Sequence, residues 1–463
     1  MPDPDPRATA APLLLAVDGG TQSTKVLLVD ARGTVHARAQ VALQPLDRRD
    51  EGVAEHPGDD LWESLVAAVR SLLRDWGGDP ARVVGLGLCS IRCCQVLLDE
   101  TGQLVAPVRS WMDARTWHPW ADDEHAEDPR VATVGAASAY LTARLTGRRA
   151  DAAAAYDQVW LAANQLPAAL LPTLVAPGEP LGPLTEDASR LLGLEVGLPV
   201  VATGNDKAVE ALGGGLVEET DDVLLSLGTY AAAMTPVAEG SARAEAAAYG
   251  ASTWLNEACP AGTRLAETGG VRHGMGTVTW TADLLGADVA DLARAAAEVP
   301  AGARDLVCVP DWLAPGDQPW RRGALVGLTG AHGRAEVARA VVEGLLLTLA
   351  DHVRAAEADL GGRFARLVLT GGGARSELLT AIAAAACDLP VVRPVETDAA
   401  GMGAAVCAAV GTGVHPDWST AVKSMVGRRA PVAPDPDLVA AYARLAPRHR
   451  ALRDGVAGLL QRL

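Results

Sequence analysis

Three glycine-rich turns in the sequence have the character of phosphate-binding loops. They lie at 18–21, 227–229 and 370–373, and each follows a short apolar run typical of a strand. Glycine lets successive backbone N–H groups approach an anion closely, and the third turn also opens a helical segment, whose N-terminal end favours phosphate. None has the Gly-Lys-Ser ending of a Walker loop or the spacing of a dinucleotide fingerprint. Any one of these turns could simply be a tight connection between two elements, but three in one chain indicate a nucleotide site.

Two charged residues flank the first turn. Asp18 ends the apolar run before it, where a carboxylate beside a phosphate cradle suits Mg²⁺, held directly or through water. The alternative is a turn Asp that satisfies its own backbone. Lys25 lies on the return strand, where it could reach a phosphate as a point charge or extend its ammonium group to solvent at an edge.

Asp206 is the strongest candidate for acid–base chemistry. The segment 198–213 has the pattern of a strand, a turn and a helix, and Asp206 falls at the helix start. There it could serve as an N-cap, or as a general base that accepts the proton of a hydroxyl group. Asn205 and Lys207 flank it with hydrogen-bond donors. Phosphoryl transfer needs little more than one such carboxylate, phosphate clamps and Mg²⁺.

A second group of residues suits a polyhydroxylated ligand. Trp111, Asp113 and Arg115 combine a flat aromatic face with a carboxylate and a guanidinium, although a core Trp beside a surface ion pair explains them equally well. Arg92 lies in an otherwise apolar link between strands, where a cation needs a cleft or a partner. The neighbouring Cys93 belongs to a group of cysteines without paired Cys-x-x-Cys spacing, which favours small buried residues over metal ligands.

Hydropathy patterning predicts a mixed α/β chain that repeats itself. The second half returns to the order strand, Gly-Thr turn, strand with which the first half begins, and this echo indicates two like-built domains joined by a hinge at 213–221. The expected strands and amphipathic helices follow from apolar runs and helical spacing. Strands are predicted over 13–18, 26–30, 35–43, 83–89, 95–99, 222–227, 230–235 and 366–370, and helices over 59–76, 336–360 and 376–387.

Composition and charge exclude several classes of function. The 40 basic and 57 acidic residues give a formal net charge of −17, which argues against nucleic acid and anionic membrane as partners. No uncharged apolar run of about 18 residues is present to span a membrane, and the acidic, proline-rich start is unlike a secretory leader. Seven cysteines, an odd number in a long chain, do not indicate a disulfide framework, so we expect the reducing cytoplasm as the location.

Taken together, these segments resemble the FGGY carbohydrate kinases, which include xylulokinase, glycerol kinase and ribulokinase. The resemblance runs in the correct order over roughly residues 13–430. It consists of the first phosphate motif at 15–25, the short acidic-to-Trp stretch at 55–62, the sugar-contact motif at 111–115, the motif of the catalytic base at 203–215, the second phosphate motif at 225–229 and the adenosine motif at 369–377.

The resemblance implies two actin-like, ribonuclease-H-like ATPase domains with a deep cleft between them. We therefore expect a disordered leader at 1–12, an N-terminal domain for sugar and base at 13–215, a nucleotide-binding C-terminal domain at 222–430, and a helical cap at 431–463. The expected activity is ATP-dependent phosphorylation of a small sugar or polyol hydroxyl, with Mg²⁺. A homodimer is expected only because family members often form one.

The resemblance also assigns roles to individual residues. Asp206 would be the general base, and Asp18 would sit with Mg²⁺. ATP would be contacted by Thr21, Gln22, Ser23, Lys25, Gly228, Thr229, Gly372, Gly373 and Glu377. The substrate would be contacted by Arg92, Cys93, Trp111, Asp113 and Lys207.

The departures from the family pattern fall on the substrate side. Residues 91–94 are Ile-Arg-Cys-Cys, where xylulokinases usually carry Gln-Met-His-Gly. The segment 115–140 is shorter than is usual in the family. From residue 315 the chain has Pro-Gly-Asp-Gln in place of Gly-Glu-Arg. These differences argue against a xylulose label. They also leave two alternatives open: a non-catalytic sensor of nucleotide and sugar, and an actin-fold ATPase coupled to an iron–sulfur partner.

Overall fold

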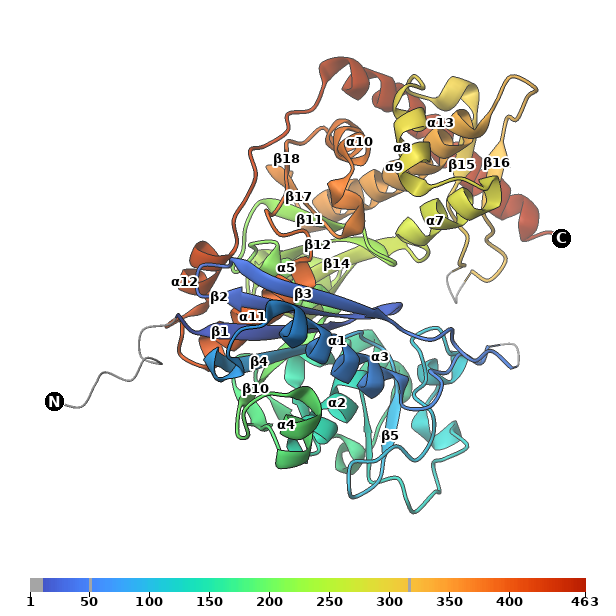
Figure 1. Cartoon of the computed structure of the whole chain (residues 1–463). Coiled ribbons are helices and arrows are strands. Elements are labelled where there is room, and N and C mark those ends of the chain that lie inside the picture. Colours follow the sequence, from blue (N-terminus) through green and yellow to red (C-terminus); the bar gives the residue numbers. More distant parts are fainter. Residues whose placement is uncertain (1–10, 50–51, 315–317) are drawn as a thin grey trace. The chain divides into compact units, whose positions relative to one another are not determined.

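The computed structural model describes residues 11–49, 52–314 and 318–463, and divides them into two compact units (Figure 1). Unit 1 contains the chain up to Glu218 together with Asn256–Arg264 and Ala399–Gly427. Unit 2 contains Glu219–Leu255, Leu265–Asp398 and Arg428–Leu463. Most of the expected leader and the sequence 315–317 lie outside the described residues.

Unit 1 is built on a six-stranded mixed sheet in the order β3-β2-β1-β4-β10-β9. β1 and β2 form the antiparallel hairpin that the sequence predicted. The pairs β1–β4 and β4–β10 are parallel. Two small sheets, β5–β6 and β7–β8, accompany it. Its strands are β1 (Leu13–Gly19), β2 (Ser23–Asp30), β3 (Val35–Ala42), β4 (Val83–Ser90), β5 (Val96–Leu98), β6 (Thr133–Gly135), β7 (Ala150–Ala152), β8 (Thr173–Val175), β9 (Pro180–Pro183) and β10 (Pro199–Asn205).

Strand β1 is apolar along its length because both faces of the sheet are covered. Successive side chains of a strand point to opposite faces. Leu13, Leu15 and Val17 pack into the core that contains Leu61 and Leu65 of α1, whereas Leu14 and Ala16 pack into the core formed with α11. The helices of unit 1 are α1 (Asp60–Trp76), α2 (Ala137–Thr146), α3 (Gln158–Asn164), α4 (Glu186–Leu192), α5 (Asp206–Gly213), α11 (Ala399–Gly411) and α12 (Trp418–Met425).

Helix α11 approaches its neighbours closely because glycines stand at the contacts. A Cβ on Gly213 would lie 1.8 Å from the carbonyl oxygen of Ala399, and one on Gly403 would lie 1.9 Å from that of Val209. A Cβ on Gly87 of β4 would lie 2.1 Å from the carbonyl oxygen of Ala404. Gly213, which the sequence placed in a hinge, is therefore required where α5 packs against α11.

Unit 2 repeats the plan around a six-stranded sheet in the order β13-β14-β12-β11-β17-β18. Strands β11 and β12 are antiparallel, and β11–β17 and β17–β18 are parallel, so the predicted echo of the first hairpin is confirmed. A two-stranded sheet, β15–β16, stands beside it. The strands are β11 (Asp222–Ser226), β12 (Ala231–Ala238), β13 (Thr253–Glu257), β14 (Thr263–Val271), β15 (Val307–Val309), β16 (Ala324–Val326), β17 (Arg366–Thr370) and β18 (Val391–Val392).

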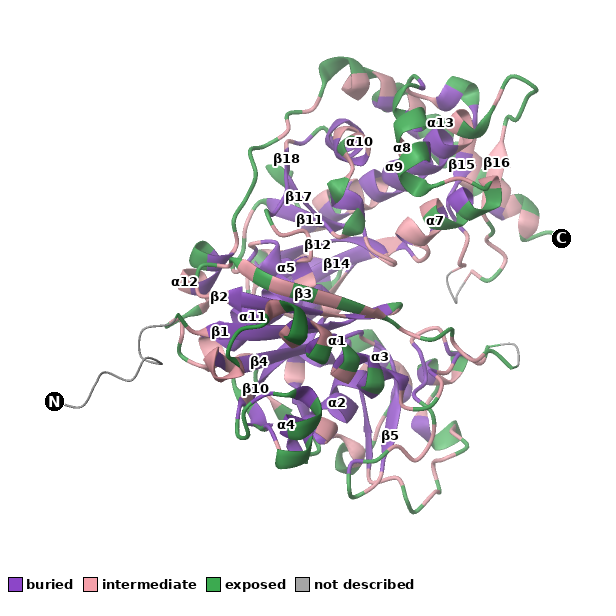
Figure 2. Ribbon diagram, in the orientation of Figure 1, coloured by how far each residue is buried: buried purple, intermediate pink, exposed green. Residues whose placement is uncertain are grey.

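The long helix α9 supplies much of the core of unit 2, where Leu345, Leu349 and Val353 pack with the strand residues Val223 and Leu225. The middle of α9 is buried, as Figure 2 shows. The helices of this unit are α6 (Ala242–Ala248), α7 (Gly274–Leu285), α8 (Val289–Ala297), α9 (Arg334–Leu360), α10 (Glu377–Cys387) and α13 (Pro436–Leu460).

The division of the chain differs from the sequence expectation in two places. Residues 256–264 and 399–427 were expected in the C-terminal domain, but they pack with unit 1. Both reach unit 1 through contacts between residues far apart in the sequence, which local hydropathy patterns do not encode. The remaining domain boundaries stay predictions.

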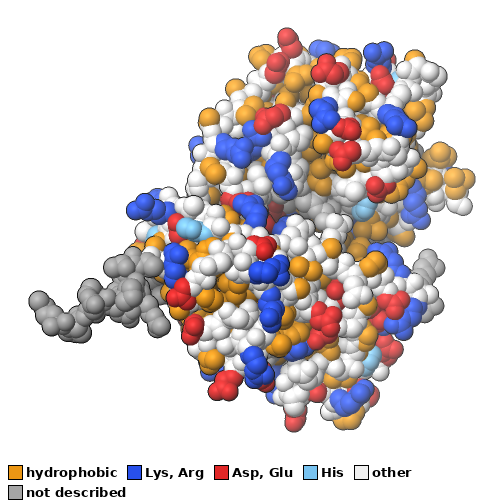
Figure 3. Space-filling model, viewed as in Figure 1, with side chains coloured by type: hydrophobic (Ala, Val, Ile, Leu, Met, Phe, Trp, Pro, Cys, Tyr) orange, Lys and Arg blue, Asp and Glu red, His pale blue; other side chains and the backbone are white. Residues whose placement is uncertain are grey.

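The surface is of mixed charge. On the face drawn in Figure 3, acidic and basic side chains are interspersed over each unit. Within the described residues, no helix combines the length and the apolar character needed to cross a membrane.

Candidate active site

The first glycine-rich turn joins β1 to β2 and places a carboxylate beside an ammonium group. Asp18 and Lys25 are register partners across the two strands, and Lys25 Nζ lies 3.4 Å from Asp18 Oδ2. The Asp18 side chain is only 8% exposed, whereas that of Lys25 is 37% exposed. The backbone N–H of Gly20 donates to the carbonyl oxygen of Ser23 at 3.0 Å and closes the turn.

The side chains of this turn differ in their surroundings. Thr21 is half-buried and Gln22 is exposed. Ser23 is buried, and its Oγ accepts a hydrogen bond from Gln40 Nε2 at 2.9 Å. Ser23 is thus already held by β3 (Val35–Ala42), while Thr21 and Gln22 are more accessible to a ligand.

The loop that carries Arg92 starts beside the same turn. Gly19 pairs with Ser90 across the parallel strands β1 and β4, and the carbonyl oxygen of Gly19 accepts the N–H of Ile91 at 2.7 Å. A Cβ on Gly19 would lie 3.2 Å from Ser90 Oγ, so the two chains are close. The carboxyl ends of β1 and β4 therefore bring together the two segments 18–21 and 91–94.

Asp206 is the first residue of α5, and it does not cap that helix. The cap is Asn205, whose Oδ1 accepts the N–H groups of Lys207 and Ala208, both at 3.0 Å. Asp206 Oδ1 is buried, and among the residues that the structure describes it has no hydrogen-bond partner. The alternative reading of Asp206 as an N-cap is therefore wrong, and its carboxylate is available for other chemistry.

The pKa values of the nearby Cys93 and Cys94 thiols are raised. Burial, together with the carboxylates of Asp157 and Asp206, raises the pKa of the Cys93 thiol well above its usual value, against the opposing effect of Arg92. Burial also raises the pKa of Cys94 to about 12. Both thiols are therefore neutral. Cys93 itself has a left-handed backbone, with φ of 60°.

Lys207 is turned toward its own helix. Its Nζ lies 2.8 Å from Glu210 Oε2, and both side chains are buried. Burial opposes the charged form of Lys207, but the carboxylates of Glu210 and Asp206 outweigh it and raise the pKa of the ammonium group. Lys207 is thus a paired cation beside Asp206. Its predicted contact with substrate stays a prediction.

Arg92 is paired with a residue that the sequence analysis did not consider. Arg92 Nη1 lies 3.0 Å from Asp157 Oδ2, and the two side chains are 12% and 7% exposed. Asp157 also caps α3, because its Oδ1 accepts the N–H groups of Val159 and Trp160. The sequence does carry a signal for this cap, since an Asp directly before a short helical run is typical of an N-cap.

Asn256 completes this cluster from a distant part of the chain. It lies at the end of β13, in the segment that packs with unit 1, and its Nδ2 donates to Asp157 Oδ2 at 3.0 Å. Its Oδ1 accepts the N–H of Gln158 at 3.0 Å. No local pattern in the sequence indicates this contact.

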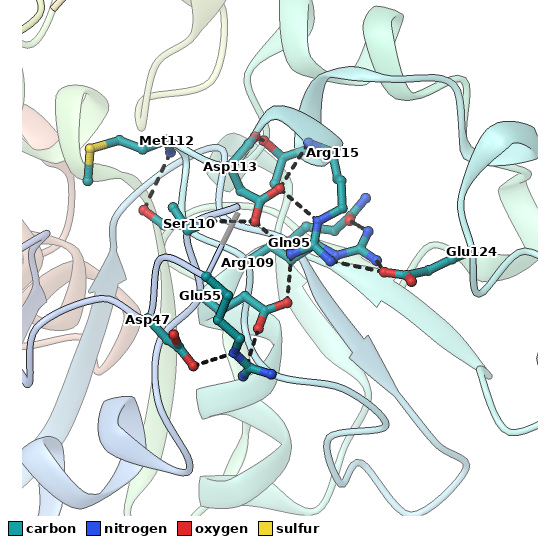
Figure 4. Close-up of polar contacts among 12 residues, drawn as sticks. Asp47, Glu55, Gln95, Arg109, Ser110, Met112, Asp113, Arg115 and Glu124 are labelled. Atoms are coloured by element: carbon teal, nitrogen blue, oxygen red, sulfur yellow. Dashed lines mark hydrogen bonds and ion pairs between the residues drawn. The ribbon is translucent and has the colours of Figure 1, made fainter. Parts of the chain in front are cut away.

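The predicted polyol motif is a buried ion pair in the structure (Figure 4). Asp113 is fully buried, and its carboxylate accepts from Arg115 and from the backbone N–H of Ala54 at 2.8 Å. Arg115 also reaches Glu55 and Glu124, at 2.6 and 2.9 Å. Arg115 holds the pKa of Asp113 below its usual value despite burial. These contacts occupy Asp113 within the protein and give its predicted contact with a sugar no support.

Trp111 is half-buried against the core of unit 1. The pair Asp113–Arg115 instead anchors the residues around it. Nearby, the buried Arg109 contacts Gln95, the residue before β5, at 2.7 Å and is paired with Asp123, so it ties the segment after 115 to the start of β5.

The second phosphate turn lies in unit 2 against the third. Gly373 donates its N–H to the carbonyl oxygen of Leu227 at 3.2 Å, and Leu227 donates to that of Thr370 at 2.9 Å. A Cβ on Gly371, whose φ is 80°, or on Gly373 would lie 2.7 Å from atoms of Leu227. The segments 227–229 and 370–373 are therefore assembled into one backbone surface.

The start of α7 completes this surface. The N–H groups of Gly274 and Met275 donate to the carbonyl oxygens of Thr229 and Gly228, at 2.8 and 3.0 Å. Gly228 and Thr229, both predicted to contact ATP, are thereby fixed from two sides. Gly372, by contrast, is exposed at the tip of the third turn.

Glu377 begins α10 and is held by an arginine that the sequence analysis missed. Arg393, which follows β18, is nearly buried and contacts both carboxylate oxygens of Glu377, at 2.8 and 3.2 Å. Arg393 Nη1 also donates to the carbonyl oxygen of Ala374 at 3.2 Å. Arg393 thus braces the glycine-rich turn against the strand behind it.

The donors available for a metal ion fit Mg²⁺ bound mainly through nucleotide phosphates. Over 11–49, 52–314 and 318–463, no group of three or more His, Cys, Asp and Glu side chains is placed to hold a metal. A single buried carboxylate beside a phosphate turn, as at Asp18, suits an ion that keeps most of its waters and is carried by phosphates.

Comparison with known proteins identifies the family. The models for the two domains of the FGGY family of carbohydrate kinases match this chain, the N-terminal one over residues 13–123 and the C-terminal one over residues 218–412. The chain belongs to the FGGY family of carbohydrate kinases. The resemblance drawn from the sequence is therefore confirmed.

Among its FGGY relatives, the uncharacterized sugar kinase YgcE of Escherichia coli (strain K12) is 37% identical, over 89% of this chain and 87% of that protein. A glycerol kinase of Dechloromonas aromatica (strain RCB) is 28% identical, over 87% of this chain and 90% of that protein. Among solved structures, the ligand-bound xylulose kinase of Lactobacillus acidophilus matches with a TM-score of 0.79 at 21% identity, over 96% of this chain and 98% of that one.

Membership of the FGGY family makes this chain a carbohydrate kinase with an actin-like α/β fold, and it implies ATP as the phosphoryl donor. The relatives are sugar kinases, so the comparisons give no support to the alternative of a sensor. The roles of single residues, and the identity of the substrate, are proposals.

Proposed function

We propose that this FGGY kinase transfers the γ-phosphoryl group of ATP to a hydroxyl group of a small sugar or polyol, with Asp206 as the general base. The observation that carries the proposal is the buried and unpartnered Oδ1 of Asp206. A carboxylate oxygen taken out of water without a donor is costly, and a substrate hydroxyl group would supply the missing donor. The proton of that group would pass to Asp206 as its oxygen attacks phosphorus and ADP leaves.

Each unit by itself carries a backbone surface that suits part of a nucleotide. In unit 1 the first turn offers Thr21, Gln22 and the ammonium group of Lys25, with Asp18 placed to meet Mg²⁺ through water. In unit 2 the surface of 227–229 and 370–373 would take the remaining phosphates and the adenosine, with Glu377 at its edge. When bound, Mg²⁺ would neutralise charge on the phosphates.

The acceptor would bind in unit 1 beside Asp206. Arg92, Cys93, Lys207 and Trp111 are the proposed neighbours, and Asp113 would act by holding Arg115 rather than by touching the substrate. All seven cysteines are buried and none is in a disulfide bond, which supports a reducing cytoplasm as the proposed location.

The proposal is tested with a panel of sugars and polyols in the presence of ATP and Mg²⁺. ADP release and the mass of the product are measured together, with an acceptor-free reaction as control. We expect at least one acceptor to stimulate ADP release and to gain one phosphoryl group. ADP release that no acceptor changes would indicate an ATPase, and binding of ATP without any release would contradict the proposed transfer.

A further inference from the structure

The charges around Asp206 are arranged in pairs. Arg92 lies 3.0 Å from the Asp157 carboxylate, and Lys207 lies 2.8 Å from that of Glu210. Ser90 pairs with Asn205 across the parallel strands β4 and β10, so the loop that carries Arg92 starts beside the start of α5, where Asp206 and Lys207 lie. Each positive charge is thus cancelled at short range by its own carboxylate, while Asp206 contributes one further negative charge.

Asp157, the partner of Arg92 in this neutral pair, is held by several hydrogen bonds. Asp157 Oδ2 accepts from both Arg92 Nη1 and Asn256 Nδ2, each at 3.0 Å, while Asp157 Oδ1 is fixed by the helix cap of α3. Neither side chain is much exposed, so water screens the pair weakly. The left-handed backbone of Cys93 fixes the loop at the next residue. Asp157 is therefore a rigid partner of Arg92.

We propose that Asp157 determines the charge specificity of the acceptor site, acting through Arg92 so that the kinase accepts neutral sugars and polyols and rejects those that carry a carboxylate. The inference rests on the proposed function, because it takes the acceptor to lie beside Asp206. A guanidinium group alone would attract a sugar acid and bind its carboxylate through two hydrogen bonds. With Asp157 in place, a substrate carboxylate meets a neutralised arginine and the negative charges of Asp157 and Asp206, and like charges in proximity disfavour binding.

The test compares acceptors that share a carbon skeleton and differ in charge. Xylitol is paired with xylonate, and glucitol with gluconate. For each pair, kcat/KM is measured by ADP release, and affinity by isothermal titration calorimetry, which needs no chemistry. The wild type is expected to favour the neutral member of a pair by at least about tenfold in both measurements.

The central variant is Asp157→Asn. Asparagine keeps an oxygen for the cap of α3, since Asn and Asp are equivalent N-caps, but it removes the charge opposite Arg92. We expect the ratio of acid to polyol binding to rise by about tenfold or more, mainly through the affinity and KM of the acid. The matched control is Asp151→Asn, which changes another buried carboxylate of the same segment that is bonded to Ser138 rather than Arg92. It should leave the ratio unchanged.

A double-mutant cycle of Arg92 and Asp157 keeps the proposal testable if one single variant folds poorly. Arg92→Gln leaves Asp157 uncompensated, so it should disfavour the acids further. The double variant Arg92→Gln/Asp157→Asn restores a neutral pair and should return the ratio to the wild-type value. A merely structural role of Asp157 would lower activity toward both members of each pair and leave the ratio fixed.

The outcomes separate the inference from the proposed function. Binding with the expected ratios but no transfer would overturn the proposed function alone. Transfer to polyols with no change of ratio in Asp157→Asn, or a wild type that prefers the acids, would overturn the inference alone. Failure of every acceptor to bind would overturn both.

Discussion

Asn205 caps the helix that Asp206 begins. Asn205 Oδ1 accepts the N–H groups of Lys207 and Ala208 at 3.0 Å, and this leaves Asp206 Oδ1 buried without a partner. Two adjacent residues of similar capping ability therefore have different roles. Asn205 satisfies the helix end, and Asp206 keeps one carboxylate oxygen that no described residue contacts by a hydrogen bond.

Loss of this cap should affect both stability and transfer. Replacing an N-cap by alanine typically costs about 1 kcal/mol, and Asn205→Ala should also let the first turn of α5 move, with a fall in kcat. The matched control is Asp435→Ala, which removes the cap of α13 in unit 2. Thermal unfolding and steady-state kinetics should show a similar loss of stability in the two variants but a fall in kcat only in Asn205→Ala. Equal kcat values would contradict the positioning role.

The two glycines Gly371 and Gly372 should respond differently to alanine. Gly371 has φ of 80° and would place a Cβ 2.7 Å from Leu227, whereas a Cβ on Gly372 would meet its nearest atom, of Arg375, at 3.9 Å. Gly371→Ala should lower the melting temperature and weaken ATP binding, because it pushes the third turn away from the second. Gly372→Ala should fold with the stability of the wild type. Thermal unfolding with and without ATP measures both effects, and equal destabilisation of the two variants would argue against the assembled turn.

Arg393 should control affinity for ATP. Its two contacts with Glu377 and its bond to the Ala374 carbonyl oxygen brace the turn that we propose to bind adenosine. Arg393→Gln should raise the KM for ATP about tenfold, which corresponds to about 1.4 kcal/mol, with little change in the KM for the acceptor. Arg450→Gln, which breaks a different pair with Asp351 in unit 2, serves as the control. An unchanged KM for ATP in Arg393→Gln would remove this residue from the nucleotide site.

The buried Asp151 should make the stability of the protein depend on pH. Burial raises its pKa to about 7, from the ordinary aspartate value of 3.8 in the unfolded chain. Between these values the folded protein keeps a proton that the unfolded chain releases, so this residue stabilises the fold below about pH 4, and its contribution is lost as the pH rises to about 7. Each unit of pKa corresponds to about 1.4 kcal/mol. The free energies of unfolding of the wild type and Asp151→Asn, measured with urea, should be similar in acid. They should diverge toward neutral pH, where the wild type becomes the less stable of the two. A difference that does not change with pH would contradict the shifted pKa.

Much of the fold could be predicted because local patterns determine it. The apolar runs around the first Gly-Thr turn become β1 and β2, and the strand expected at 366–370 is β17 with the same bounds. Helical spacing of apolar residues likewise anticipates α1 and α9. In each case the residues that define the element also make its main contacts with the core.

The parts that sequence reasoning missed depend on contacts between distant residues. Asn256 reaches Asp157 across 99 positions, and α11 packs on β4 and α5 through glycines that resemble hinge or turn residues when considered locally. The choice between Asn205 and Asp206 as the cap was also not decidable from composition, because both residues accept helix N–H groups equally well. At Asp113, a residue pattern that suits a polyol is satisfied inside the protein by Arg115 and Ala54.

The most direct test of the account is the turnover number of Asp206→Asn, measured with the best acceptor of the panel. The change keeps the size and shape of the side chain but removes the base. General-base assistance is typically worth about 10²–10⁴-fold, so we expect kcat to fall by at least about 10² while the affinity for ATP, measured by calorimetry, changes little. A kcat equal to that of the wild type would show that another group accepts the proton, and the proposed role of Asp206 would be wrong.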